Sequence, residues 1–185
     1  MPGVFARAIL LAAALVAAAS ANAQTRHRRE PRETDKPAPP PPLSVDKRDS
    51  LVQAPGAFTG RPYWLALAQC GGLYFKLNTL YAADAVQARV VKPDPRATAD
   101  YTRRLTEAIK TASVYFNGAE RMLMTDRGIE RSDAVLVYNG QSAAAGDRVK
   151  TIDAALAATN VCPALYQACQ EAFPKACNET VAPTG

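Results

Sequence analysis

Four cysteines constrain the fold of this chain more than any other feature, because two disulfide bonds among them would tie distant segments together. The cysteines are Cys70, Cys162, Cys169 and Cys177. An even number of cysteines is typical of a disulfide framework when a protein is exported to an oxidising compartment. A zinc site, a c-type haem or a redox-active dithiol would need a C-x-x-C pair, which the sequence lacks. We therefore predict two structural disulfides and no metal or cofactor.

Helix geometry restricts how these cysteines pair. In a helix, Cys162 and Cys169 would lie about 10 Å apart, whereas a disulfide needs Cα atoms within about 7 Å. In an up-down bundle, Cys70 in the first helix lies level with the later part of the last helix, which favours a bond to Cys169 or Cys177. A bond to Cys177 would force the disfavoured pair of Cys162 and Cys169, so we expect Cys70 to bond Cys169. That leaves Cys162 to bond Cys177. A second pairing stays open if Pro174 folds the end of the chain back, because Cys70 would then bond Cys162. Cys169 would then bond Cys177.

The first 23 residues have the three parts of a cleavable export signal. Arg7 supplies a positive charge, Ala8–Ala19 is an unbroken apolar stretch, and a small-x-small sequence ends at Ala23. A membrane-spanning helix needs about 20 apolar residues, which is more than this stretch provides. We therefore expect cleavage between Ala23 and Gln24. The alanine-rich core is typical of bacterial signals and predicts a periplasmic or extracellular mature chain with no membrane span.

Residues 24–55 are predicted to form a disordered linker. Its first part, as far as Lys36, mixes both charge signs and contains no large apolar residue. The run Pro37–Pro42 favours an extended polyproline II conformation. The only histidine of the chain, His27, also lies here, with no second ligand residue nearby. The net charge of +5 includes Arg7 of the signal, and the rest is divided evenly between linker and domain, so we predict no nucleic-acid partner.

Apolar residues recur at three- and four-residue spacing from Arg61 onward, which is typical of amphipathic α-helices. We predict helices over residues 62–89, 100–125, 133–159 and 163–173. The third of these helices could be broken at Gly140 or Gly146, because glycine costs about 1 kcal/mol relative to alanine inside a helix. Such a break would give five helices. Residues 56–178 are expected to form an all-α domain, a small antiparallel up-down helical bundle, followed by a tail over 179–185.

The predicted domain lacks the residues on which catalysis most often depends. It contains no histidine, and its cysteines are expected to be in disulfides. Its carboxylates lie among basic residues, as on solvated helix faces. Gly71 and Gly72 lie inside a helical pattern, where they favour close helix packing or a bend over nucleotide binding. We therefore predict no catalytic residue.

Three functional hypotheses remain from the sequence. The leading one is a non-enzymatic exported module that binds, or structurally supports, a component of the cell envelope. The second is a small-ligand carrier whose bundle encloses a cavity lined by Tyr74, Asn78 and Tyr115. The third is a carboxylate-dependent hydrolase, which would need two facing carboxylates in a cleft.

Overall fold

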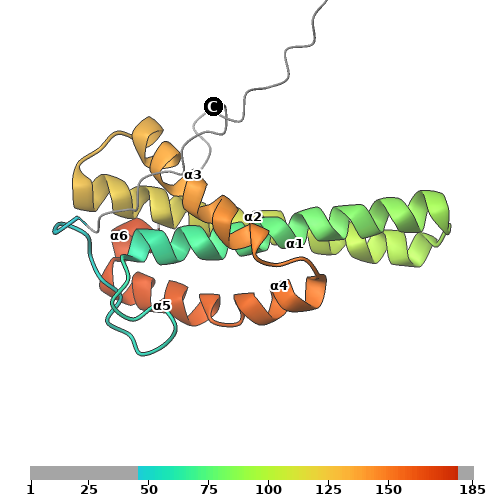
Figure 1. Ribbon diagram of the computed structural model, residues 1–185, viewed down its shortest axis with the longest axis horizontal. Helices are drawn as coiled ribbons and strands as arrows, with labels where there is room; N and C mark the ends of the chain where they lie inside the picture. The colour runs from blue at the N-terminus through green and yellow to red at the C-terminus, as the bar shows by residue number, and fades with distance from the viewer. Residues whose placement is uncertain (1–45, 179–185) are drawn as a thin grey trace, which may run out of the picture. The chain divides into compact units, whose positions relative to one another are not determined.

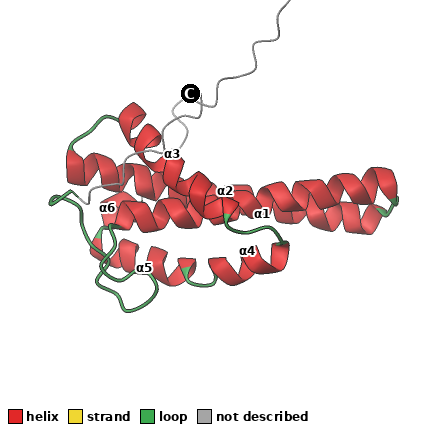
Figure 2. Cartoon of the chain, in the orientation of Figure 1, coloured by secondary structure: helices red, strands yellow, loops and turns green. Residues whose placement is uncertain are grey.

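The structure is a computed structural model, and it describes residues 46–178 (Figure 1). Within this range the regular secondary structure is all helical (Figure 2). The same range also contains an isolated antiparallel β-bridge between Leu51 and Pro62. The predicted all-α class is confirmed. None of the described helices is long and apolar enough to cross a membrane. The predicted cleavage site between Ala23 and Gln24, the linker as far as residue 45 and the tail over 179–185 lie outside the described residues.

The chain between residues 63 and 177 is divided among six α-helices and one π-helical turn. They are α1 (Tyr63–Val86), η2 (Gln87–Val91), α2 (Pro95–Arg127), α3 (Arg131–Asp147), α4 (Ile152–Thr159), α5 (Cys162–Ala172) and α6 (Pro174–Cys177). The predicted third helix is broken just after Gly146, at residues 148–151. The break is stabilised by Thr151, whose hydroxyl accepts a hydrogen bond from the backbone N–H of Ala154 at 3.2 Å and so caps α4.

The helix α2 begins and ends at residues that suit helix termini. Asp94 precedes it and accepts hydrogen bonds from the backbone N–H groups of Arg96 and Ala97, at 2.9 and 3.0 Å. Pro95 occupies the first turn, where a missing N–H costs little. Gly128 ends the helix with a left-handed φ of 65°. These signals give a helix of 33 residues, longer than predicted, that lies alongside α1 (Figure 1).

The helix α1 is the one around which the others pack, since α2, α3, α4 and α5 all contact it. Its first half is buried on nearly all sides, where Ala66, Ala68 and Gly71 alternate with the larger Trp64 and Leu67. A helix that is apolar all round is typical of such a central position. The sequence prediction had instead assigned one apolar face to each helix.

The segment before α1 belongs to the packed domain. Val52 is buried among the core residues. The side chain of Asp49 is also buried, and it forms an ion pair with Arg127 near the end of α2. The predicted boundary, with a disordered linker as far as residue 55, is therefore wrong at its C-terminal end. This stretch has no helical periodicity, and its attachment depends on single anchoring residues that composition does not reveal.

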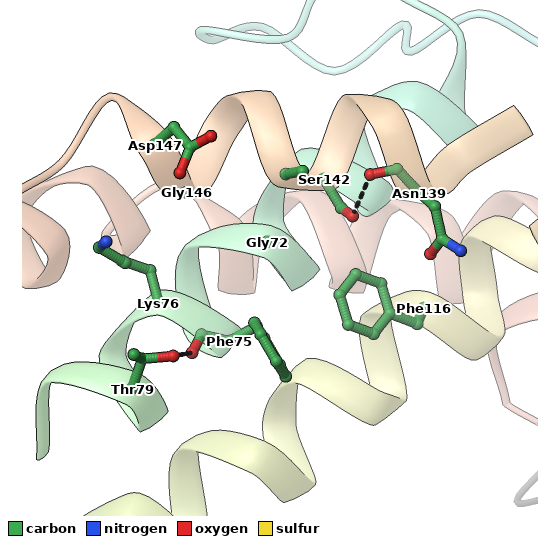
Figure 3. A pocket seen from close by; sticks show the side chains of 10 residues that line it. Gly72, Phe75, Lys76, Thr79, Phe116, Asn139, Ser142, Gly146 and Asp147 are labelled. Carbon is green, nitrogen blue, oxygen red and sulfur yellow. Dashed lines mark hydrogen bonds between the residues drawn. The ribbon is translucent and has the colours of Figure 1, made fainter. Parts of the chain in front are cut away.

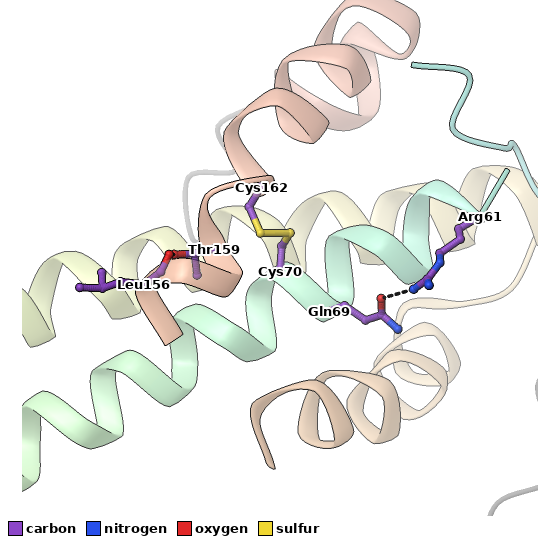
Figure 4. The surroundings of a disulfide bond; sticks show 6 residues. All are labelled: Arg61, Gln69, Cys70, Leu156, Thr159 and Cys162. Carbon is purple, nitrogen blue, oxygen red and sulfur yellow. Dashed lines mark hydrogen bonds between the residues drawn. A yellow bond between two sulfur atoms is a disulfide. The ribbon is translucent and has the colours of Figure 1, made fainter. Parts of the chain in front are cut away.

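The structure contradicts the favoured disulfide pairing and has the second one. Cys70 is bonded to Cys162, with a Cα separation of 5.8 Å (Figure 4). Cys169 is bonded to Cys177, with a Cα separation of 5.9 Å. The favoured bonds, Cys70 to Cys169 and Cys162 to Cys177, assumed an up-down bundle in which the later part of the last helix lies level with Cys70. The break before α4 places the start of α5 beside Cys70, and the chain folds back at Pro174 into α6.

Candidate functional site

The three residues predicted to line one cavity do not share one. The rings of Tyr74 and Tyr115 stack with centroids 5.4 Å apart, and Tyr115 also meets Tyr166 edge to face at 5.4 Å. The amide of Asn78 donates a hydrogen bond to the carbonyl oxygen of Leu105 at 2.9 Å. Asn78 therefore holds α1 against α2. These residues belong to the packing between helices.

Tyr74 and Tyr115 line two separate hollows. The hollow beside Tyr74 has a volume of about 430 Å³ and is also lined by Arg103 and Glu107. The hollow beside Tyr115 has a volume of about 370 Å³ and is lined by residues of α2 and α5. Burial, followed by the neighbouring tyrosines, raises the pKa of Tyr115 well above its ordinary value. Its phenol stays protonated at neutral pH and is not suited to act as a base.

A different hollow, of about 450 Å³, lies between α1 and α3 and is the candidate functional site (Figure 3). We call it the α1–α3 groove. The residues that line it come mainly from these two helices, with one ring from α2: Gly72, Phe75, Lys76, Thr79, Phe116, Asn139, Ser142, Ala143, Gly146 and Asp147. Its volume is in the range of small-ligand pockets, about 300 to 1,000 Å³.

Glycines bring the two helices of this groove together. A Cβ atom built on Gly72 would overlap with the backbone carbonyl of Ser142, and one built on Gly146 would lie 3.0 Å from the carbonyl oxygen of Gly72. The backbones of α1 and α3 are therefore in direct contact. The predicted role of Gly72 in close helix packing is confirmed, whereas Gly146 was interpreted only as a helix breaker.

Two phenylalanines give the groove its apolar surface. Phe75 is 51 % exposed, which is unusual for a ring on the central helix. The ring of Phe116 stacks on Tyr138 with centroids 5.5 Å apart, and it occupies the space that a side chain at Gly71 would need. One ring is therefore held rigidly by the fold while the other remains accessible. A rigid apolar wall beside an exposed aromatic side chain is suited to hold an apolar group.

Polar groups lie at the two ends of the groove. Lys76 and Asp147 are at one end and Asn139 is at the other (Figure 3). The hydroxyls of the groove are used within their own helices, since Ser142 donates to the carbonyl of Asn139 at 2.8 Å and Thr79 to that of Phe75 at 3.1 Å. The groove therefore offers a cation, a carboxylate and an amide around an apolar centre.

The α1–α3 groove does not contain the two facing carboxylates that a hydrolase would need. Asp147 is the only carboxylate in the α1–α3 groove. Asp100 is paired with Arg103 and Arg104 on the surface of α2. Within residues 46–178 no cluster of three or more histidines, cysteines or carboxylates could hold a metal ion. The groove is suited to binding, and among its lining residues there is no pair of carboxylates.

A second charged cluster, made of Asp49, Arg127 and Trp64, is structural. Arg127 forms two hydrogen bonds to the carboxylate of Asp49, both at 2.8 Å, and its guanidinium lies 4.9 Å from the Trp64 ring centroid. Burial opposes the ionisation of Asp49, but the hydrogen bonds and charge of Arg127 outweigh it, and the pKa of Asp49 is lowered. Ser50 adds two bonds to Asp126, each 2.8 Å long. We call these five residues, Asp49, Ser50, Trp64, Asp126 and Arg127, the N-terminal clamp.

Replacement of Gly72 by alanine is expected to destabilise the α1–α3 contact. The added Cβ would force the backbone of Ser142 away, and overpacking of this kind costs about 1 to 3 kcal/mol. Urea unfolding followed by the fluorescence of Trp64, the single tryptophan, measures the effect. The matched control is Gly140→Ala on α3, where nothing lies within 4 Å of a new Cβ. That variant is expected to gain about 0.5 to 1 kcal/mol. Equal effects at the two glycines would contradict the close contact.

No protein-family model, curated protein or solved structure matches this chain. The α1–α3 groove is therefore assigned as the candidate site from its own geometry and chemistry.

Proposed function

We propose that this chain is a non-enzymatic binding module of the cell envelope, exported through a signal cleaved between Ala23 and Gln24. In this proposal the helices form a small bundle stapled by two disulfides. The bundle presents the α1–α3 groove to a partner protein. The observation that carries the proposal is the apolar groove of about 450 Å³ with the half-exposed ring of Phe75 beside it.

The chemistry of the groove indicates what it would bind. An apolar side chain of the partner would pack between Phe75 and Phe116, because aromatic rings bury large areas and are common anchors of interfaces. Lys76 and Asp147 carry opposite charges at one end of the groove, so a partner segment with polar backbone groups would find both a donor and an acceptor there. The expected ligand is an apolar anchor residue within a polar segment.

A small-ligand carrier is the second candidate, and the volume of the same groove supports it. It differs from the hypothesis made from the sequence, which placed the ligand among Tyr74, Asn78 and Tyr115. A small apolar molecule would occupy the space between the phenylalanines without further protein contacts. Mass spectrometry of the intact protein under native conditions would detect a co-purified ligand of this kind.

Filling the groove tests both candidates. Ala143 and Ala144 are both exposed on α3, but only Ala143 lines the groove. Ala143→Arg is expected to fill the groove and reduce binding at least 10-fold, since it removes the space for a central apolar anchor. Ala144→Arg adds the same charge on the same helix and should bind as the wild type does.

The measurement is photocrosslinking of the purified chain to a fraction of its own cell envelope, followed by titration with the identified partner. The proposal predicts a crosslink that Ala143→Arg loses and Ala144→Arg keeps. Equal binding by the wild type and both arginine variants would show that the groove is not the binding site.

A further inference from the structure

The far end of the α1–α2 hairpin carries a second surface, unrelated to the groove. We call residues 86–97 the hairpin tip. It contains the end of α1, the turn η2 and the first residues of α2. η2 packs against α1 and α2, and in Figure 1 this end of the hairpin continues beyond α3 and α4.

Three valines of the hairpin tip are exposed to an unusual degree. Val86, Val90 and Val91 expose 53, 65 and 67 % of their surfaces. Ala88, which lies between them in the sequence, is buried. The valines therefore point away from the hairpin interior.

The π-helical turn affects how these valines are placed around the hairpin tip. In an α-helix, Val86 and Val91 would be about 140° apart around the axis. In η2 the hydrogen bonds instead join residues five apart, as from the backbone N–H of Lys92 to the carbonyl of Gln87 at 3.1 Å. Residues five apart then lie about one turn above each other. The π-helical turn thus brings Val91 toward the side of Val86, the last residue of α1, and Val90 precedes Val91 within the turn.

Cations surround this apolar end. Arg89, Lys92 and Arg96 belong to the hairpin tip and are exposed. The first turn of α2 contains no acidic residue, and the positive end of its helix dipole offsets part of the negative charge of Asp94. The one carboxylate of the tip, that of Asp94, accepts hydrogen bonds from two backbone N–H groups of α2. The tip is therefore apolar at its end and positively charged around it.

We propose that the hairpin tip inserts its three valines into the headgroup region of an anionic lipid surface. Exposed aliphatic side chains gain free energy at the boundary between headgroups and acyl chains, and neighbouring cations are attracted to anionic headgroups. A protein partner is a poorer fit, because a stable interface buries about 800 Å² on each side, which three valines and a narrow hairpin end do not supply. The inference does not depend on the α1–α3 groove.

Tryptophan fluorescence of the purified full chain tests the insertion. Trp64 is buried and supplies a constant background, so a second tryptophan reports its own surroundings. Val91→Trp places this reporter on the tip, and Leu136→Trp places it on α3 at a residue that is 74 % exposed. We expect emission from Val91→Trp to shift to the blue with vesicles of phosphatidylglycerol and phosphatidylcholine. Brominated acyl chains should quench it, while Leu136→Trp shows neither effect.

Binding measurements distinguish the contribution of the cations of the hairpin tip from that of its valines. Replacement of Arg89, Lys92 and Arg96 by glutamine is expected to weaken binding to these vesicles on the order of 100-fold. Replacement of Val90 and Val91 by serine is expected to weaken it about 10-fold. Far-UV circular dichroism confirms that each variant is folded. Vesicles of phosphatidylcholine alone should bind weakly in every case.

Two results would overturn the proposal. One is co-sedimentation with anionic vesicles without any change in the emission of Val91→Trp, because another part of the chain would then make the contact. The other is a blue shift only when a protein partner is added, which would assign the hairpin tip to a protein interface.

Discussion

Removal of the Cys70–Cys162 bond by alanine at both positions is expected to lower the free energy of unfolding by about 4 to 5 kcal/mol. The bond joins residues 92 positions apart, and the entropy that a cross-link removes from the unfolded chain grows with the length of the loop it closes. A loss of this size is a large part of the stability of a typical domain, about 5 to 15 kcal/mol. Urea unfolding at neutral pH, followed by Trp64 fluorescence, measures it.

The second disulfide provides a matched control. Cys169 and Cys177 are separated by 8 positions, so their replacement by alanine removes the same atoms but a much shorter loop. The expected loss is about 2.5 kcal/mol. If both double variants lose the same free energy, the cost lies in the missing sulfur atoms and not in the loop that the long-range bond closes.

Arg127→Ala is expected to lower the free energy of unfolding by about 3 to 5 kcal/mol. The substitution leaves the buried carboxylate of Asp49 without its cation, which costs far more than the pair itself contributes. It also removes the guanidinium that lies over the ring of Trp64. Thermal unfolding and the emission maximum of Trp64 would both change, because the N-terminal clamp would open.

Arg104 is the appropriate control for Arg127. It lies on the same helix, pairs with Asp100 and is placed over the ring of Tyr81, but its side chain is exposed. Arg104→Ala is expected to leave the stability nearly unchanged, because exposed ion pairs are screened by water and salt. A similar loss in both variants would mean that burial is not what makes the clamp strong.

Acid should weaken the N-terminal clamp in a defined direction. Because the folded pKa of Asp49 lies below its unfolded value of about 3.9, the carboxylate stabilises the fold above that value. This contribution disappears as the pH falls through the folded pKa. The difference in stability between the wild type and Asp49→Asn should therefore be constant from neutral pH to about pH 5 and shrink in more acidic solution.

The helices could be predicted from the sequence because their signals are local. The apolar spacing of α2 and the capping residues around it identify the helix without any knowledge of its neighbours. The disulfide pairing was harder to predict than the helices, since it depends on where α5 lies along α1. That position is determined by the four residues between α3 and α4, which a helical pattern alone does not separate from the helix.

The candidate site was harder to predict than the fold. The α1–α3 groove exists because Gly72 meets the backbone of Ser142, and this contact joins residues that are distant in the sequence. The glycine pair at Gly71 and Gly72 was a usable signal, since close packing was expected there. Nothing in the sequence separates Phe75, which remains exposed, from the aromatic residues that become core.

The disulfides join the cysteines in the order in which they occur along the chain, the first with the second and the third with the fourth. In the proposed export from N- to C-terminus, Cys70 emerges first and its correct partner Cys162 is the next thiol to appear. An oxidase that joins thiols as they emerge would therefore make both native bonds directly. Such a chain can mature in a compartment with an oxidase alone, without an isomerase to correct mispaired cysteines.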